Sequence, residues 1–382
     1  MIFDTVMKKT LLVVAMTILS ITGSRALAIN DSVPLFSTLR MEVRADFEYH
    51  HLMTSSSYMP VTHNDNTYGF VGRYFNIHVG GNFTKDLSYY FRQRIVANPG
   101  STNFFDNTDF LYLNYQITPR WSVRVGKEAL AVGGFEYDAP PIDVLYWSYY
   151  WDNFYCFQLA AGVKYQTLDG KNAIIAQVGN SPYLHYGSPF KNSLLSYNLF
   201  WSGNFGCFHT LYSFNMFQRD KKGHFMSYLA LGNQFTFKTW DFYVDFIHRA
   251  TSTKQLMKDF GIIAKLNYHV TPTLNLFVKG AYEQNLDMDE YNNYLQTEEI
   301  WDCLALPGQI YTYGGLGLEY RPKRCPDIRI HGFVAEFVTR NLKNEPANPI
   351  WGKAYHADHN ITANVGITWN IDILRYINKK VK

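Results

Sequence analysis

Alternation of apolar and polar residues recurs along almost the whole chain, and this pattern constrains the fold more than any other feature. It is clearest in residues 39–50, 260–271 and 361–372, where every second side chain is apolar and most of those between are polar or small. Successive side chains of a β-strand point to opposite faces of the sheet. Each segment therefore predicts a strand with one apolar and one mostly polar face.

Weaker copies of the pattern raise the number of predicted strands to sixteen. They cover residues 70–83, 88–96, 110–117, 121–128, 157–166, 173–179, 194–202, 207–217, 225–237, 241–249, 274–283, 310–320 and 328–339. Short turns and longer polar links alternate between them. This is the pattern of an all-β transmembrane barrel of about sixteen antiparallel strands, with short periplasmic turns and long extracellular loops. Residues 51–67, 285–309 and 340–360 are predicted to lie outside the cell.

Composition distinguishes this barrel from a soluble β-protein. The chain contains 29 Tyr and 28 Phe, although the polar faces keep the mean hydropathy slightly negative at −0.20. Many aromatic residues stand beside the short turns, as Phe83, Tyr115, Trp121, Tyr165 and Trp240 do. Aromatic girdles at the two membrane interfaces are typical of outer-membrane barrels. The predicted location is therefore the outer membrane of a Gram-negative bacterium.

The first 28 residues are expected to be a cleaved signal peptide. Lys8 and Lys9 precede an apolar run over residues 11–21, and Ala26-Leu27-Ala28 forms a small-residue cleavage site. Residues 29–382 would then form a single barrel domain. The formal charge of the whole chain is +3, and much of that excess lies in the signal region. Such a balance argues against nucleic-acid binding, which normally needs a basic surplus.

The sequence contains no motif that predicts catalysis. Nucleophile-elbow, phosphate-binding and zinc-protease patterns are absent from the sequence, so no enzyme, cofactor or metal site is predicted. The four cysteines (Cys156, Cys207, Cys303 and Cys325) are widely separated, and a disulfide between two of them is left open. An outer-membrane barrel lipase would lack these motifs as well, and it stays, together with an adhesin, as a minor alternative.

Basic residues gather on the polar faces of the early strands. If the apolar faces contact lipid, these residues line the lumen, where cationic groups attract anions. The predicted basic lining consists of Arg40, Arg44, Arg92, Arg94, Arg124, Lys127 and Lys164. Lys127 stands two residues after Val125 and should share its apolar face, so it lines the lumen only if the chain bends at Gly126. In an alternative interpretation, the arginines of the first strand pair with carboxylates of the same strand and leave a mixed lining.

The link over residues 129–155 is expected to fold into the barrel and narrow it. It follows the fifth predicted strand, and its glycines permit tight bends while its prolines discourage further sheet. The predicted constriction residues are Gly134, Glu136, Asp138, Asp143, Tyr146, Trp147 and Trp151. The aromatic run over 145–151 could offer a track for sugar rings. Alternatively, it packs the loop against the wall or forms a subunit contact.

Three segments resemble a known family. They are Leu111-Tyr112-Leu113-Asn114-Tyr115, Val123-Arg124-Val125-Gly126-Lys127 and Gly133-Gly134-Phe135-Glu136. They resemble the phosphate-selective porin O and P family, in the version common in Bacteroidetes. The resemblance implies a sixteen-stranded, often trimeric porin with an inward loop after the fifth strand and basic lumen residues, of which Arg124 and Lys127 match best. Acidic residues on the first strand and in 287–302 depart from the family pattern.

Together these features predict an outer-membrane porin, a passive diffusion channel for small hydrophilic solutes that could prefer anions or phosphate. A saccharide-selective channel that uses the loop aromatics is the alternative. The expected partners are outer-membrane lipid and lipopolysaccharide, small solutes or anions, and identical subunits of a homotrimer. The sequence leaves open the solute, the ion selectivity, the pore radius, the oligomeric state and any pairing of the cysteines.

Overall fold

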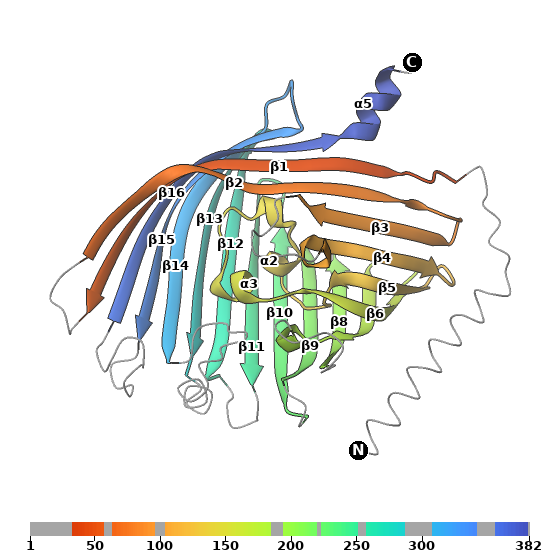
Figure 1. The fold of residues 1–382 in the computed structure, drawn as a ribbon, viewed down its shortest axis with the longest axis horizontal. Helices are drawn as coiled ribbons and strands as arrows, with labels where there is room; N and C mark the ends of the chain where they lie inside the picture. Colours follow the sequence, from red (N-terminus) through yellow and green to blue (C-terminus); the bar gives the residue numbers. More distant parts are fainter. Residues whose placement is uncertain are drawn as a thin grey trace.

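The computed structural model describes residues 33–56, 63–95, 104–184, 194–219, 223–250, 257–286, 308–341 and 356–380. These residues form a closed antiparallel barrel of sixteen strands, in which sequence neighbours pair and β1 pairs with β16 (Figure 1). The strands are β1 (Thr38–Ser56), β2 (His63–Asn82), β3 (Leu87–Arg94), β4 (Thr108–Gln116), β5 (Trp121–Ala129), β6 (Phe157–Gln166), β7 (Asn172–Asn180), β8 (Leu195–Phe205), β9 (Phe208–Gln218), β10 (Phe225–Thr236), β11 (Trp240–Ala250), β12 (Asp259–Thr271), β13 (Leu274–Asn285), β14 (Gln309–Tyr320), β15 (Ile328–Asn341) and β16 (His356–Asp372). The predicted fold class and strand count are confirmed.

The strand register places the two predicted faces on opposite sides of the wall. Phe47 of β1 pairs with Val365 of β16, and their side chains are exposed on the outer surface. Glu48 pairs with Asn364, and both are buried inside the barrel. Because alternation puts every second residue on the outer surface, the apolar face lies outside the barrel and the polar face lies inside it.

Threonine builds several of the short turns between strands. Thr84, Thr118 and Thr271 each stand at the start of such a turn. In each case the Oγ1 atom accepts hydrogen bonds from the backbone N–H groups two and three residues later, at 3.0–3.3 Å. A threonine hydroxyl thereby satisfies donors that the strand ladder leaves unpaired. Which membrane side these turns face stays a prediction.

The described helices are short, and none is long and apolar enough to cross a membrane. They are η1 (Phe104–Asn107), α2 (Phe135–Asp138), η2 (Pro141–Asp143), α3 (Tyr149–Asn153), η3 (Pro182–Leu184) and α5 (Ile373–Lys380). Helix α5 follows β16 at the rim, where Arg375 forms an ion pair with Asp327. The predicted signal peptide, the acidic segment 287–302 and Cys303 lie outside the described residues. Cys156, Cys207 and Cys325 are free thiols.

Residues 130–156, which we call the inner loop, run inside the ring of strands and carry α2, η2 and α3 (Figure 1). The loop packs against inward-facing apolar side chains of the wall. One cluster joins Leu130, Tyr150 and Phe154 of the loop to wall residues such as Tyr228 and Ile263. A second cluster surrounds Tyr146 with Phe277, Tyr313, Phe333 and Ala335. This half of the lumen is therefore filled by a hydrophobic core.

Candidate functional site

The inner loop enters the lumen through a bend that is held by strand β9. The N–H of Gly133 donates to Ser213 Oγ at 2.8 Å, and that of Gly134 donates to the Leu211 carbonyl at 3.2 Å. Gly134 has a φ of +112°, a conformation that side chains other than glycine rarely adopt. The bend directs the start of α2 toward β11.

Asp245 of β11 receives the first turn of α2. Its two carboxylate oxygens accept the N–H groups of Phe135 and Glu136, each at 2.8 Å. The first N–H groups of a helix have no partner within the helix, so a buried carboxylate at this position satisfies both. Glu283 of β13 does the same for α3, where it accepts from the N–H groups of Tyr149 and Tyr150.

A buried ion pair joins the loop to β13. Lys279 contacts the carboxylate of Glu136 and also donates to the carbonyl of Tyr146 at 2.5 Å. The Tyr146 hydroxyl donates to the Lys279 carbonyl at 3.1 Å. Burial raises the pKa of Tyr146, so its hydroxyl remains a neutral donor. Lys279 and Tyr146 thus hold each other through two reciprocal hydrogen bonds.

Two arginines fix the middle of the loop. Arg329 of β15 donates to the Ile142 carbonyl at 2.8 Å and pairs with Asp143 at 2.7 Å. Arg44 of β1 donates to the carbonyls of Val144 and Leu145, at 2.7 and 3.1 Å. The loop is thereby anchored to β1 and β15, several strands away from β5 and β6, which it connects.

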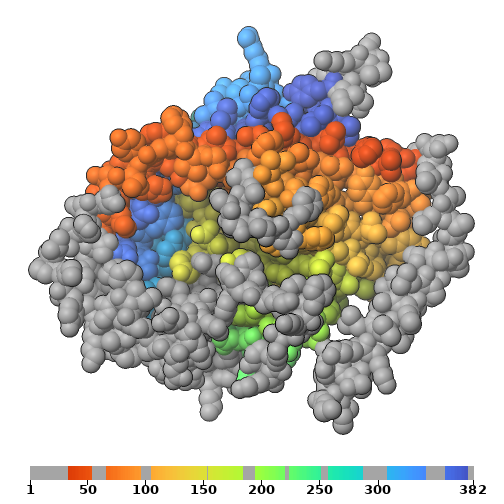
Figure 2. Space-filling model, viewed as in Figure 1, coloured from red at the N-terminus to blue at the C-terminus, as the bar shows by residue number. Residues whose placement is uncertain are grey.

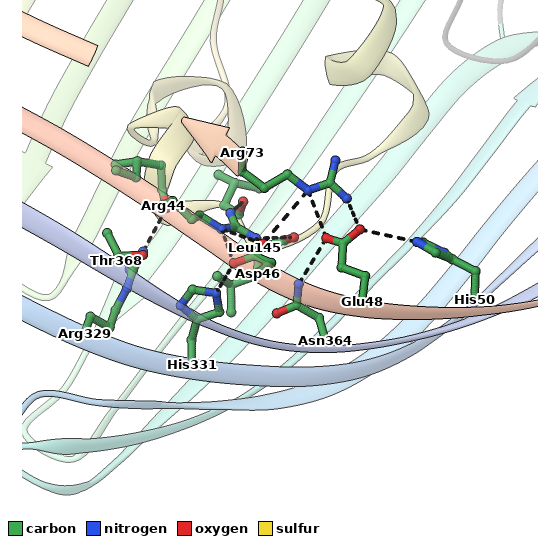
Figure 3. A network of polar contacts seen from close by, with 12 residues as sticks. Arg44, Asp46, Glu48, His50, Arg73, Leu145, Arg329, His331, Asn364 and Thr368 are labelled. Carbon is green, nitrogen blue, oxygen red and sulfur yellow. Dashed lines mark hydrogen bonds and ion pairs between the residues drawn. The ribbon is translucent and has the colours of Figure 1, made fainter. Parts of the chain in front are cut away.

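Asp46 organises the Arg44 anchor, as Figure 3 shows. Its carboxylate binds Arg44 at 2.8 Å and the His331 ring at 2.9 Å. Farther along β1, the carboxylate of Glu48 forms an ion pair with Arg73 and accepts a hydrogen bond from the side-chain amide of Asn364. Arg44 therefore pairs with an acid of its own strand, as the mixed-charge alternative expected, whereas Arg40 does not. The partners of Asp46 and Glu48 come from other strands as well as from β1 itself.

A cavity of about 500 Å³ remains between the inner loop and the wall formed by β1–β8. In the space-filling view, strands β1–β6, coloured red to yellow, form one side of the molecule (Figure 2). Four basic side chains from this wall line the cavity: Arg40, Arg92, Arg124 and Lys164. Three carboxylates also line it, from Glu42, Glu128 and Asp138. The four cations come from four different strands.

The cations of the cavity differ in how far they are neutralised. Arg92 pairs with Asp109 at 2.9 Å, and Arg124 pairs with Glu128 at 3.1 Å. Within the described part of the chain, Arg40 and Lys164 form no ion pair. These two side chains therefore contribute positive charge that no protein carboxylate offsets by direct contact.

Three of the predicted basic residues do not line this cavity. Arg44 is buried beneath the inner loop, and Arg94 pairs with Asp109 at 2.6 Å. Lys127 pairs in register with Leu111 and Leu159, which point outward, and its amino group donates to the carbonyl of Phe105. Gly126 has a φ of +142° but does not turn Lys127 into the lining of the cavity.

The predicted constriction residues divide between the two sides of the loop. Asp138 and Trp151 line the cavity. Gly134, Glu136, Asp143 and Tyr146 instead face the wall and serve as anchors. Trp147 packs on Trp151, with ring centroids 5.2 Å apart. Most of the aromatic run thus packs the loop against the barrel, as the alternative expected.

Sequence reasoning missed the wall residues that hold the loop. Lys279, Arg329, Asp245 and Glu283 are charged residues at inward-facing positions of β11, β13 and β15, and their parity was the signal that could have found them. No group of three or more His, Cys, Asp or Glu side chains suited to a metal occurs among the described residues.

Comparison with known proteins shows what this arrangement is similar to. The phosphate-selective porin O and P family matches residues 43–193, which include β2–β7 and the whole inner loop. No curated protein sequence matches the chain.

Solved structures share the fold at low sequence identity. The anion-selective porin from Comamonas acidovorans aligns with a TM-score of 0.56 and 11% identity, covering 87% of this chain and 99% of that one. The outer membrane channel DcaP of Acinetobacter baumannii has a TM-score of 0.57 and 11% identity, with 87% and 96% covered. OprB of Pseudomonas putida has a TM-score of 0.54 and 11% identity, with 86% and 94% covered. With the porin fold and the family match in place, the chain is an outer-membrane porin whose residues 43–193 match the phosphate-selective porin O and P family.

Proposed function

We propose that this porin is a passive diffusion channel that prefers anions, and that solutes cross through the cavity between the inner loop and strands β1–β8. The other half of the lumen is filled by the loop and its core, so the cavity is the remaining route. The family match supports an anion preference, as does the fold shared with the anion-selective porin of Comamonas acidovorans.

The observation that carries the proposal is the presence of Arg40 and Lys164 in the cavity wall without an ion-paired carboxylate among the described residues. Two of the three acids that line the cavity are engaged, since Glu42 contacts His78 at 2.9 Å and Glu128 pairs with Arg124. The third, Asp138, forms no ion pair among the described residues, so Arg40 and Lys164 together still leave a net positive charge. Low-dielectric walls focus the field of uncompensated charge into a narrow passage. Anions should therefore be concentrated in the cavity relative to cations.

The test is the reversal potential of the purified protein in a planar bilayer under a KCl gradient. We expect an anion-selective wild type, and a double variant Arg40→Ala with Lys164→Ala should shift toward cations. The shift should be larger in dilute salt, because screening shortens from about 10 Å at 0.1 M to about 3 Å at 1 M. Replacing Lys85 and Lys171, which lie in short turns, removes the same charge and should leave selectivity unchanged. A cation-selective wild type would refute the proposal.

Two further expectations belong to the proposal. The exposed outer face would contact outer-membrane lipid and lipopolysaccharide, and the chain would assemble as a homotrimer, as the family resemblance implies. The mass of the detergent-solubilised protein, measured by light scattering, tests the trimer. We assign the channel no catalytic step.

The orientation of the barrel is tested by labelling single introduced cysteines on intact cells. A cysteine at Asn292, in a predicted external loop, should be labelled, whereas a cysteine at Asp86, in a predicted periplasmic turn, should not.

A further inference from the structure

We propose that the cavity wall contains a subsite for organic anions that carry an aromatic ring, with aromatic carboxylates as the fitting class. The inference rests on the proposed function, because it assumes that solutes pass through this cavity. It goes beyond a preference for anions, since it requires the solute to use two kinds of surface at once.

The first surface is a group of aromatic rings on β3 and β4. Tyr90, Phe110 and Tyr112 all line the cavity. Their ring centroids are 5.8 Å apart for Tyr90 and Phe110, 5.8 Å for Tyr90 and Tyr112, and 6.1 Å for Phe110 and Tyr112. The three rings thus form one continuous aromatic surface on the wall of a water-accessible passage. Aromatic rings of this kind are more often buried in a core.

The second surface consists of guanidinium groups stacked on the same rings. Arg92 lies 4.6 Å from the centroid of Phe110, and Arg124 lies 4.4 Å from that of Tyr112. A stacked guanidinium keeps its N–H donors in its own plane, pointing away from the ring, where a planar carboxylate can accept them. Arg92 is buried and paired with Asp109, whereas the side chain of Arg124 is 41% exposed and contacts Glu128 through one terminal nitrogen. The remaining donors of Arg124 are therefore the ones that a carboxylate in the cavity can reach.

Glycines on the neighbouring strands make room for these rings. Gly80 pairs in register with Tyr90, and Gly126 pairs with Tyr112. A Cβ atom at position 80 would come within 3.0 Å of Tyr90 Cδ2, so the ring occupies the space that a side chain would fill. The rings therefore lie against the wall, and the passage beside them stays open.

The combination of surfaces selects a solute class. A small inorganic anion can bind the guanidinium groups but gains nothing from the rings. A neutral sugar can pack on the rings but has no charge to pair with the guanidinium groups. Lys164 and Arg40, in the same cavity, add charge that favours an anion. Benzoate presents a planar carboxylate next to a planar ring and can contact both surfaces. Stacking of this kind should increase occupancy about three- to tenfold over a non-aromatic anion of the same charge.

The experiment measures how strongly two carboxylates inhibit the chloride current through single channels. Benzoate is compared with cyclohexanecarboxylate, which has the same charge and similar size but no aromatic ring. Wild type should be inhibited by benzoate at a concentration about three- to tenfold lower. Tyr112→Leu should abolish this difference, and Tyr112→Phe should keep it. Tyr115→Leu, on the outward face of the same strand, is the matched control and should behave as wild type.

The outcomes separate the two proposals. Equal inhibition by both carboxylates in an anion-selective wild type would overturn the aromatic subsite and leave the proposed function standing. Equal effects of the leucine substitutions at 112 and 115 would overturn it as well. A cation-selective wild type would overturn both proposals. If Tyr112→Leu does not fold, Phe110→Leu applies the same test to the neighbouring ring, with Tyr115→Leu again as its control.

Discussion

The two halves of the barrel interior share the same alternating strand pattern but differ in what covers their inner faces. One half is packed against the inner loop, and the other lines a cavity. On β9–β15, inward residues such as Tyr228, Ile263 and Phe277 are apolar and are covered by the inner loop. On β1–β8, the inward residues that line the cavity include Arg40 and Lys164, which keep contact with the passage. The outer face is apolar in both halves. The two halves therefore differ in their inner faces, which determine where the lumen is filled and where a cavity remains.

This difference teaches that a charge inside a barrel is not by itself a pore charge. In the filled half, Lys279 and Arg329 are buried and bind the loop. In the open half, Arg40 is exposed in the cavity and does not bind the inner loop. The environment of each cation, and not its parity on the strand, separates anchors from selectivity residues.

The largest expected effect comes from breaking the Lys279 anchor. Lys279→Ala leaves the carboxylate of Glu136 buried without its partner, which typically costs about 3–5 kcal/mol. The loop should then detach from β13, so that single-channel conductance rises or fluctuates and the barrel unfolds at lower urea concentration. Urea titration followed by gel mobility, together with bilayer recording, measures both effects.

A double replacement sharpens this test. Lys279→Leu with Glu136→Leu removes both charges and fills much of the same volume, so it should recover most of the lost stability. Arg40→Ala, in the open half, should change selectivity and leave stability close to wild type. If Lys279→Ala and Arg40→Ala have equal effects on unfolding, the distinction between the two halves is wrong.

The sequence is sufficient to predict the strands, their faces and the inward loop. Alternation is a local property, and each strand shows its own faces without information from elsewhere. Val365 and Asn364, for example, have opposite parity in the pattern and lie on opposite sides of the wall. Length marks 129–155 as a long link, and its inward course is expected from its position after the fifth strand, where many sixteen-stranded porins fold a loop inward.

The sequence does not predict which cations are free, because ion pairs join residues that are far apart in the chain. Arg44 is predicted to line the pore, yet its partners include the carbonyls of Val144 and Leu145 from the loop. Glu136 is predicted in the constriction, and its partner Lys279 lies eight strands later. Parity gives the face of a residue but not what covers that face.

The second prediction concerns the outer face, which should be equally intolerant of charge all around the barrel. Val125 on β5 and Val365 on β16 are both well exposed on the outside. An arginine near the bilayer midplane typically costs about 2–4 kcal/mol, so both Val→Arg variants should lose similar stability. Asn364→Ala, on the inner face, should lose less. Equal tolerance of Val365→Arg and Asn364→Ala in refolding titrations would contradict the register.

The smallest effect comes from one substitution made in both halves. Tyr146→Phe removes a buried hydroxyl that donates to the Lys279 carbonyl, and loss of such a bond costs about 0.5–1.5 kcal/mol. Tyr112→Phe removes a hydroxyl for which the described residues offer no hydrogen-bond partner, so its effect on stability should be near zero. The ring stays in both variants, and packing therefore changes little. Paired urea titrations should show a lower midpoint for Tyr146→Phe alone. Equal midpoints would mean that the reciprocal bonds between Tyr146 and Lys279 do not hold the loop.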